Sequence, residues 1–294
     1  MPGEKYGFIG CGSVGRTLAQ AFSRAGRQVV AAWSRSGDGA LLMQREVEGL
    51  RTAASAQGVA DECDFVWLTV SDDAIARVAD GIAWRSHHKV VHCSGATDVE
   101  VMAKAKSDGA TVGGFHPLQM FTDPAVALKG LPGVTVGVEA SDPAFLETLK
   151  RLAGDIGCNT VEVPRGQRAI YHASVYYVGP FFIALLSEAV SIWKTFGASE
   201  RDALNALLPL LAGTTSAVTS SSLAGGMGGC VARGDVGTVL RHVAAMDLFS
   251  PDAGELYRSL TKRTIPLGLA RGSLATSVGD QIRKALSTAP TTKS

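Results

Sequence analysis

The sequence contains little of what marks secreted, metal-binding, nucleic-acid-binding or membrane proteins. Its five cysteines are scattered without a C-x-x-C pair, which predicts free thiols in a reducing compartment and no metal site. The formal net charge is only +1 and there is no long basic run, so we expect no nucleic-acid partner. The most apolar run, Ala173–Leu186, is too short to span a bilayer and predicts a buried helix and no membrane partner. No signal peptide precedes the first apolar segment, and we therefore expect a cytoplasmic protein.

A glycine-rich turn follows the first apolar segment, Tyr6–Gly10. The turn has the pattern G-x-G-x-x-G and leads into an amphipathic stretch and then a second apolar strand, residues 28–33, which completes a βαβ unit. In this pattern the first glycine permits the tight turn, the second lets the backbone approach a pyrophosphate, and the third lets the helix pack on the strand. The N–H groups at the helix start then bind the phosphates. We expect a dinucleotide to be held by Gly10, Cys11, Gly12, Ser13, Val14 and Gly15.

Apolar strands and helical segments alternate through the first half of the chain, and no strand pattern recurs in the second half. The expected strands are residues 6–10, 28–33, 64–70, 89–93, 111–115, 134–138 and 160–163. Such alternation is typical of a parallel sheet with right-handed crossovers. The sequence therefore predicts an α/β Rossmann-like domain with a mainly parallel sheet over residues 1–164, followed by an all-α domain over residues 165–294.

The end of the second strand indicates which nicotinamide cofactor binds. A carboxylate that would take the ribose hydroxyls of NAD is missing there, and the sequence reads Ser34-Arg35-Ser36 instead. An arginine can form a bidentate pair with the 2′-phosphate of NADP, and the two serine hydroxyls can add donors. Arg35 can also stack on the adenine or stay in solvent. We predict NADP, with Ser34, Arg35 and Ser36 as cofactor-binding residues.

Two further strand ends carry small polar residues at the edge where ligands bind in such sheets. We expect Thr69, Val70, Ser71, Asp73, Cys93 and Ser94 to lie along the ribose and nicotinamide. Asp72 and Asp73 have an alternative role as caps of the next helix.

Several motifs that occur together and in order carry a family resemblance. They are Gly10–Gly15, Thr69–Asp73, His92–Gly95, Phe115–Gln119, Tyr171–Ala173 and Ala232–Asp235. The chain resembles a little-characterised bacterial family of Rossmann-like oxidoreductases with a helical C-terminal domain of unknown function. That family is similar to ketopantoate reductases, pyrroline-5-carboxylate reductases and β-hydroxyacid dehydrogenases. The resemblance implies a helical domain of the 6-phosphogluconate dehydrogenase C-terminal type.

The chain departs from these relatives in its polar groups. Val178-Gly179-Pro180 and Gly228-Gly229-Cys230 replace an asparagine-containing segment and a Thr-Gly-Pro segment. Related dehydrogenases use a lysine on the long helix, and no lysine lies between Arg165 and Ile192. A lysine mechanism therefore cannot be transferred to this chain.

Two of the six histidines are candidates for proton donation. His116 follows a strand at the ligand-binding edge, and His172 lies on the long helix expected to face the same cleft. Each has a structural alternative: a turn histidine bonded to the backbone, or a histidine satisfied in the core. His87 and His88 are expected in solvent, whereas His92 and His242 are expected to pack.

The remaining candidate residues bind substrate in our interpretation. Tyr171 and Tyr176 flank His172, and Arg233 can hold a substrate carboxylate beside Asp235, which is also a helix cap. The whole pattern predicts an NADP-dependent oxidoreductase that reduces a small carbonyl or imine compound, with a carboxylic acid as the small-molecule substrate. A deazaflavin-dependent reductase and a non-catalytic dinucleotide-sensing module are the alternatives. The apolar long helix also predicts a homodimer through the helical domain.

Overall fold

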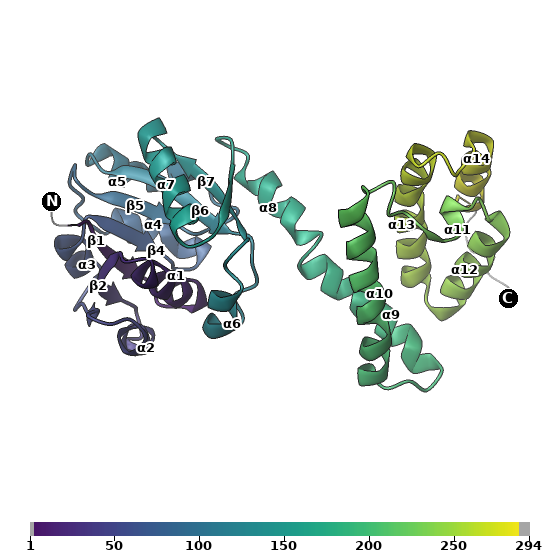
Figure 1. Cartoon of the computed structure of the whole chain (residues 1–294), viewed down its shortest axis with the longest axis horizontal. Helices are drawn as coiled ribbons and strands as arrows, with labels where there is room; N and C mark the ends of the chain where they lie inside the picture. The colour runs from purple at the N-terminus through teal and green to yellow at the C-terminus, as the bar shows by residue number, and fades with distance from the viewer. Residues whose placement is uncertain (1–2, 288–294) are drawn as a thin grey trace. The chain divides into compact units, whose positions relative to one another are not determined.

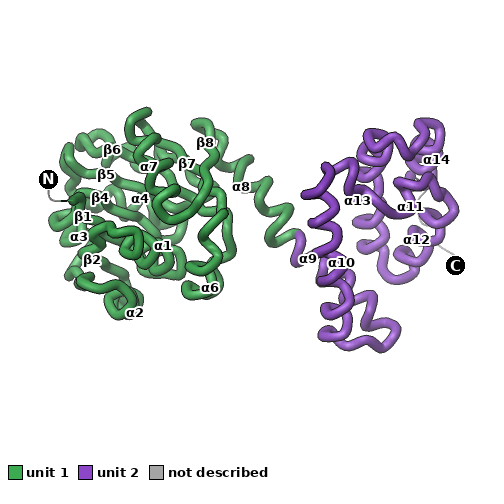
Figure 2. The backbone as a smooth tube through the Cα atoms, viewed as in Figure 1, with its two compact units in different colours: residues 1–181 green, residues 182–294 purple. Residues whose placement is uncertain are grey.

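The computed structural model describes residues 3–287. The chain forms two compact units, residues 1–181 and residues 182–294 (Figure 2). The sheet ends at Glu162, and the helix that follows it, α8 (Arg168–Tyr176), still belongs to the first unit. The division into domains at residues 164 and 165 stays a prediction made from the order of strands and helices.

The first unit contains an eight-stranded sheet in the order β3-β2-β1-β4-β5-β6-β7-β8 (Figure 1). Only the pair β6–β7 is antiparallel among the described strands, which confirms the predicted mainly parallel sheet. The strand β3 was not predicted, because it consists of two exposed polar residues at the sheet edge. The strands are β1 (Lys5–Ile9), β2 (Gln28–Trp33), β3 (Arg51–Thr52), β4 (Phe65–Leu68), β5 (Lys89–His92), β6 (Thr111–Pro117), β7 (Thr135–Ala140) and β8 (Asn159–Glu162).

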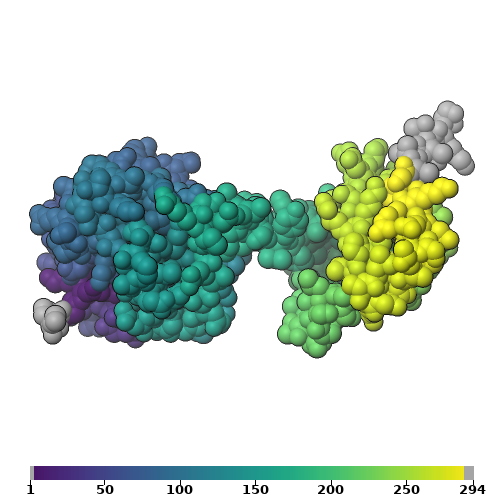
Figure 3. Space-filling view, turned by 90° about the horizontal axis from the view of Figure 1, so that it is seen from above, coloured from purple at the N-terminus to yellow at the C-terminus, as the bar shows by residue number. Residues whose placement is uncertain are grey.

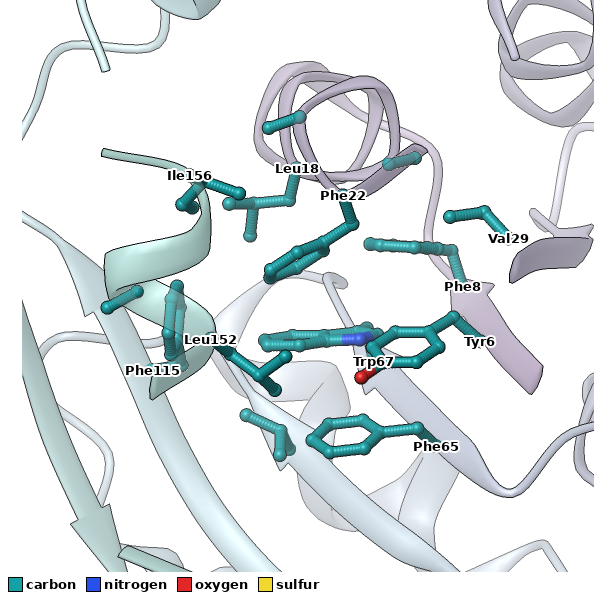
Figure 4. Close-up of a cluster of buried hydrophobic side chains, with 14 of the residues drawn as sticks. Tyr6, Phe8, Leu18, Phe22, Val29, Phe65, Trp67, Phe115, Leu152 and Ile156 are labelled. Atoms are coloured by element: carbon teal, nitrogen blue, oxygen red, sulfur yellow. The ribbon is translucent and has the colours of Figure 1, made fainter. Parts of the chain in front are cut away.

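Helices cover both faces of this sheet, because alternate residues of its buried strands point to opposite sides. One face packs an aromatic core in which the ring of Trp67 lies 4.8 Å from that of Phe22 and 5.1 Å from that of Phe115, measured between centroids (Figure 4). The helices on this side are α1 (Ser13–Arg24), α2 (Asp38–Glu46), α6 (Pro124–Lys129) and α7 (Pro143–Asp155). The other face packs aliphatic side chains against α3 (Ala56–Glu62), α4 (Asp72–Asp80), η1 (Val99–Met102) and α5 (Ala103–Ser107).

The described part of the second unit is helical throughout, which confirms the predicted helical part of the fold. Its long helix α10 begins with a capping box, in which Ser199 and Asp202 exchange hydrogen bonds. A small core of Val231, Val239, Val243, Ile265, Leu274, Ile282 and Leu286 joins the later helices, whose packed surface is seen in Figure 3. The helices are α9 (Pro180–Thr195, which begins in the first unit), α10 (Glu200–Ser220), α11 (Gly229–Ala232), α12 (Val236–Phe249), α13 (Pro251–Ala270) and α14 (Thr276–Ala285).

The prediction that Ala173–Leu186 is a buried helix is wrong. The side chains of Phe181 and Ile183 are 48% and 56% exposed in this single chain. The segment is also longer than its most apolar run, because Arg168–Thr195 forms one helical stretch across the turn before Pro180. By length and composition alone this stretch is the one helix among the described residues that could cross a membrane, which is weak support for a membrane helix.

Candidate functional site

The glycine-rich turn is locked between β1 and β4. Gly10 has a φ of +97°, in the left-handed region that favours glycine, and a Cβ there would lie 2.7 Å from the Thr69 backbone. A Cβ on Gly15 would lie 2.5 Å from the carbonyl oxygen of Gly10. The Thr69 hydroxyl donates to that same oxygen, so Thr69 fixes the turn.

The N-terminus of α1 is open. Gly12 is its N-cap residue, and no side chain caps the first N–H groups. A Cβ on Gly12 would have no atom within 4 Å, so there is free space beside this backbone. An uncapped helix start next to open space suits a pyrophosphate, which the backbone of Ser13 and Val14 can reach. The Cys11 thiol is buried, and burial raises its pKa to about 11. The role of Cys11 toward a cofactor stays a prediction.

The turn after β2 presents one free cation. Arg35 is exposed and forms no ion pair with another residue in the described range 3–287. Ser36 is exposed as well, whereas the Ser34 hydroxyl accepts a hydrogen bond of 3.1 Å from the Ala40 N–H and holds the start of α2. The residues therefore fit a 2′-phosphate, with Ser34 ordering the turn.

The polar side chains at the end of β4 are more exposed to solvent than those at the end of β5. Ser71 and Asp73 are exposed at the start of α4, where Ser71 is the N-cap residue and its side chain makes no capping bond. The Ser94 hydroxyl accepts from the N–H of Ala96 and of Thr97, so a local turn already uses it. Burial raises the pKa of the Cys93 thiol. The roles of these residues, and of Val70, toward a cofactor stay predictions.

Two rows of residues cross β5, β6 and β7 beside that edge. The strand register aligns His92, Gly114 and Glu139 in the first row, and it aligns His116 with Gly137 in the second. A Cβ on Gly114 would overlap the guanidinium of Arg168, and a Cβ on Gly137 would overlap the phenol of Tyr171. Because neither glycine has a Cβ, the first turns of α8 pack directly against the sheet at Gly114 and Gly137. We call these two positions the glycine bed.

Arg168 occupies the first row and was missed by the sequence analysis. Its side chain is fully buried; Nε donates to Glu139 Oε2 over 2.6 Å, and Nη1 donates to the Ser94 carbonyl over 2.7 Å. Its Nη2 is buried and has no hydrogen-bond partner among residues 3–287. Burial raises the pKa of Glu139, and the adjacent Arg168 opposes that rise. The charged pair therefore ties α8 to β7, and the hydrogen bond from Nη1 ties α8 to the β5 turn.

The second row brings the two candidate histidines together. The imidazole centroids of His116 and His172 are 5.3 Å apart, and a Cβ on Gly95 would collide with both rings. The Tyr171 hydroxyl lies 3.0 Å from His116 Nδ1 and shares a hydrogen bond with it. The ring of Tyr176 lies 5.7 Å from that of His172. The structure thus places both histidines next to Ser94, where the sequence predicted them, and their catalytic role stays a prediction.

The electrostatics of this site favour the neutral form of His116 and of His92. Burial first, and then the charges of His172 and Arg168, lower the pKa of His116 to about 4. Burial and Arg168 likewise lower the pKa of His92 to about 3. Burial raises the pKa of Tyr171 to about 12. At neutral pH His92, His116 and Tyr171 are therefore uncharged beside the buried Arg168–Glu139 pair.

Two other predicted residues belong to the second unit. They are Arg233 and Asp235, and Asp235 caps α12 by accepting from the Thr238 N–H over 2.9 Å. Their part in substrate binding stays a prediction. The expectation that His88 is in solvent is wrong, because its ring is buried and bonds the Ala60 carbonyl.

A cavity of about 570 Å³ in the first unit lies beside η1, α5 and the ends of β7 and β8. Glu139 lines it, but His116 and His172 do not. The histidine pair and the glycine-rich turn, and not this cavity, carry the arrangement that suits a dinucleotide and a reacting group.

Two parts of the chain match known families. Residues 5–94 match the family described as NADP oxidoreductase coenzyme F420-dependent. Residues 134–264 match a domain of unknown function, DUF2520. These matches confirm the resemblance to Rossmann-like oxidoreductases with a helical C-terminal domain of unknown function, and with it the predicted enzyme class and NADP as the cofactor of that class. A search of curated proteins finds no match.

Solved structures share the fold over most of the chain. A candidate NADP oxidoreductase from Bacteroides fragilis is 22% identical with a TM-score of 0.70, over 90% of this chain and 98% of that one. Pyrroline carboxylate reductase from Plasmodium falciparum, with NADP bound, is 14% identical with a TM-score of 0.61, over 91% and 99%. A reductive aminase from Aspergillus terreus, in complex with NADPH and ethyl-5-oxohexanoate, is 13% identical with a TM-score of 0.61, over 97% and 92%. At these identities the likeness establishes the predicted fold, a Rossmann-like domain followed by a helical domain.

Proposed function

We propose that this chain is an NADP-dependent reductase of a small carbonyl or imine compound, and that the substrate is a carboxylic acid. One observation carries the proposal. The dinucleotide turn after β1 and the His116–His172 pair, which lies against Gly95 after β5, are at the carboxyl edge of the same sheet, within one compact unit. Ligands of open α/β sheets bind at that edge.

The chain's own residues provide for the cofactor. The open start of α1 holds the pyrophosphate, Arg35 and Ser36 hold the 2′-phosphate, and Ser71 and Asp73 line the path of the ribose. When bound, reduced nicotinamide supplies a hydride to the substrate carbon. The protein must then orient that carbon and provide a proton or stabilise the charge on the heteroatom.

His172 is our first choice for proton donation. Its nitrogens have no hydrogen bond to another residue in the described chain, whereas His116 Nδ1 is already bonded to Tyr171. His172 lies on helix α8, and His116 lies inside strand β6 and not in the turn expected after it, so the structure holds both side chains on regular elements. His116 is the alternative donor. Tyr176 lines the same cluster, and Arg233 and Asp235 are proposed to act on the substrate carboxylate.

A reduced deazaflavin is the second candidate for the hydride source, since the family matched by residues 5–94 is described as coenzyme F420-dependent. A dinucleotide-sensing module without turnover is the third candidate. We also propose a cytoplasmic homodimer through the helical domain. Exposed apolar side chains on α9 and α10, such as Ile183, Leu185 and Leu210, support an interface there.

The test begins with titration of NADPH, NADH and reduced deazaflavin by isothermal calorimetry. Oxidation of the bound cofactor is then followed with a panel of 2-oxo acids, aldehydes and cyclic imines. If His172 donates the proton, His172→Ala lowers the rate by about 100-fold or more with little change in NADPH affinity. The same pattern in His116→Ala would move the role to His116. Tight NADPH binding without turnover of any compound would favour the sensing module.

A further inference from the structure

We infer that this site selects a neutral carbonyl over a protonated imine, because the groups around the His116–His172 pair are arranged to stabilise negative charge on the reacting heteroatom. The inference rests on the proposed function and narrows its substrate class. It follows from three features of the first unit: the place of Arg168, the hydrogen bond of Tyr171, and the pairing of the nearby carboxylate.

The two substrate classes need opposite surroundings. When a carbonyl carbon accepts a hydride from reduced nicotinamide, the C=O π pair moves onto oxygen, and the resulting alkoxide takes one proton to give an alcohol. When a protonated imine accepts a hydride, its π pair moves onto nitrogen, the positive charge disappears, and the amine forms without a further proton. Fixed donors and positive potential lower the barrier of the first reaction and raise that of the second.

Arg168 supplies the positive potential. It lies over Gly114, so it stands between Glu139 on β7 and His92 on β5, and its Nη1 reaches the Ser94 carbonyl at the end of β5. The guanidinium is therefore nearer than the carboxylate to the β5 turn that touches both imidazoles. The lowered pKa values of His92 and His116 agree, because each shift has Arg168 among its causes.

Tyr171 fixes the direction of the donor on His116. The Tyr171 hydroxyl has one hydrogen-bond partner in the described part of the chain, His116 Nδ1. In the inferred arrangement the hydroxyl donates to Nδ1, and the neutral imidazole carries its own proton on Nε2. The Nε2 edge of His116 faces Gly95 and has no hydrogen-bond partner among residues 3–287. An N–H is thus left for a carbonyl oxygen, which has lone pairs, and it offers nothing to an iminium nitrogen, which has none.

The titratable and charged side chains that face His116 in the described part of the chain include no unpaired carboxylate. From α8 they are Arg168, Tyr171 and His172; from β5, His92; and from β7, Glu139. Glu139 is the carboxylate of this set, and it is 7% exposed and paired with Arg168. A substrate cation at the histidine pair would therefore meet no unpaired negative charge from these residues.

The first experiment measures the tautomer and charge of the histidines and needs no substrate turnover. Long-range ¹H–¹⁵N spectra of ¹⁵N-histidine protein report the tautomer and charge of each imidazole, and His116→Gln assigns the His116 signals. We expect the neutral Nε2–H form of His116 from pH 8 down to about pH 5. Tyr171→Phe should give a mixture of tautomers, whereas Tyr177→Phe, the same change at an exposed neighbouring tyrosine, should leave the His116 signals unchanged. A protonated imidazole at pH 7, or the Nδ1–H form, would overturn the inference.

The second experiment compares matched substrates from the panel above. For compounds with the same ring, we expect the ketone to be reduced at least 10-fold faster than the cyclic imine at a pH where the imine is protonated. Tyr171→Phe should lower ketone reduction by about 5-fold, the equivalent of one hydrogen bond. Faster reduction of the imine refutes the inference while supporting the reductase. Absence of turnover with every compound counts against the proposed function, and the histidine spectra then decide the inference alone.

Discussion

Removing the buried guanidinium of Arg168 should destabilise the first unit more than any exposed arginine would. In Arg168→Met the side chain keeps much of its length, but Glu139 loses its 2.6 Å donor and the Ser94 carbonyl loses its 2.7 Å donor. Both groups stay buried because α8 still covers them. Breaking a buried ion pair from one side costs about 3–5 kcal/mol, since the remaining charge has no partner and little water.

The size of the loss should depend on pH. Burial already raises the pKa of Glu139, and removal of Arg168 takes away the group that opposes the rise. A carboxyl whose folded pKa exceeds its unfolded value stabilises the fold below the unfolded pKa, and this contribution is lost as pH rises through the folded pKa. The cost of Arg168→Met should therefore be smaller at pH 5 than at pH 8, where the carboxylate must be buried as an anion.

Urea unfolding followed by tryptophan fluorescence measures this cost. In a Trp193→Phe background the remaining tryptophans, Trp33, Trp67 and Trp84, all lie in the first unit, so their signal reports that unit. Arg165→Met is the matched control, because Arg165 is paired with Glu100 while 77% exposed. An exposed pair contributes about 0–1 kcal/mol.

The double variant Arg168→Met/Glu139→Met separates the pair from the packing. Without either charge the site contains no unpaired ion, so we expect most of the lost stability to return. The reasoning is refuted if Arg168→Met costs no more than Arg165→Met, or if the second substitution adds to the first instead of offsetting it.

Three further predictions concern the cofactor turn, acid stability and the thiols. Arg35→Ala should weaken NADPH by about 1.5–3 kcal/mol and leave NADH unchanged, whereas Arg45→Ala on the exposed side of α2 should change neither in calorimetric titrations. Because His116 and His92 have folded pKa values of about 4 and about 3, the unfolded chain takes up protons first, and stability should fall as pH drops from about 6.5 toward 4; a flat urea midpoint between pH 7 and 5 would contradict this. Cys11, Cys63 and Cys158 are buried with raised thiol pKa values, so a thiol reagent at pH 8 should label them only after unfolding.

The sheet could be predicted from the sequence because buried parallel strands are continuous apolar runs. β4 is an example, with the sequence Phe-Val-Trp-Leu, and its end marks the ligand edge. The two-residue strand β3 gave no such signal. The histidines could be placed one at a time, since His116 was expected just after a strand, which the structure extends to Pro117, and His172 was expected on the long helix.

The glycine bed beneath α8 could not be predicted in the same way. Gly114 and Gly137 are adjacent only through the antiparallel register of β6 and β7, which no local pattern encodes. Arg168 was overlooked because an arginine is expected to be buried only where a carboxylate pairs with it, and its partner Glu139 lies 29 residues away in the sequence. The exposure of Phe181 and Ile183 was missed for a related reason: apolar character indicates that a surface is covered, but not that the same chain covers it.

Substitution of Gly137 tests whether the glycine bed, through Tyr171, positions His116. A Cβ there would lie 2.7 Å from Tyr171 Cζ and 3.1 Å from Val163 Cγ2, so Gly137→Ala must displace the phenol from His116. We expect a cost of about 1–3 kcal/mol from overpacking, together with a mixed His116 tautomer. Gly154→Ala on α7 is the control, where open space predicts a gain of about 0.5–1 kcal/mol. Tyr171→Ala should relieve the clash, so the two changes should be non-additive by about 0.5–3 kcal/mol. Strict additivity would show that Gly137 acts on the strand alone and not through Tyr171.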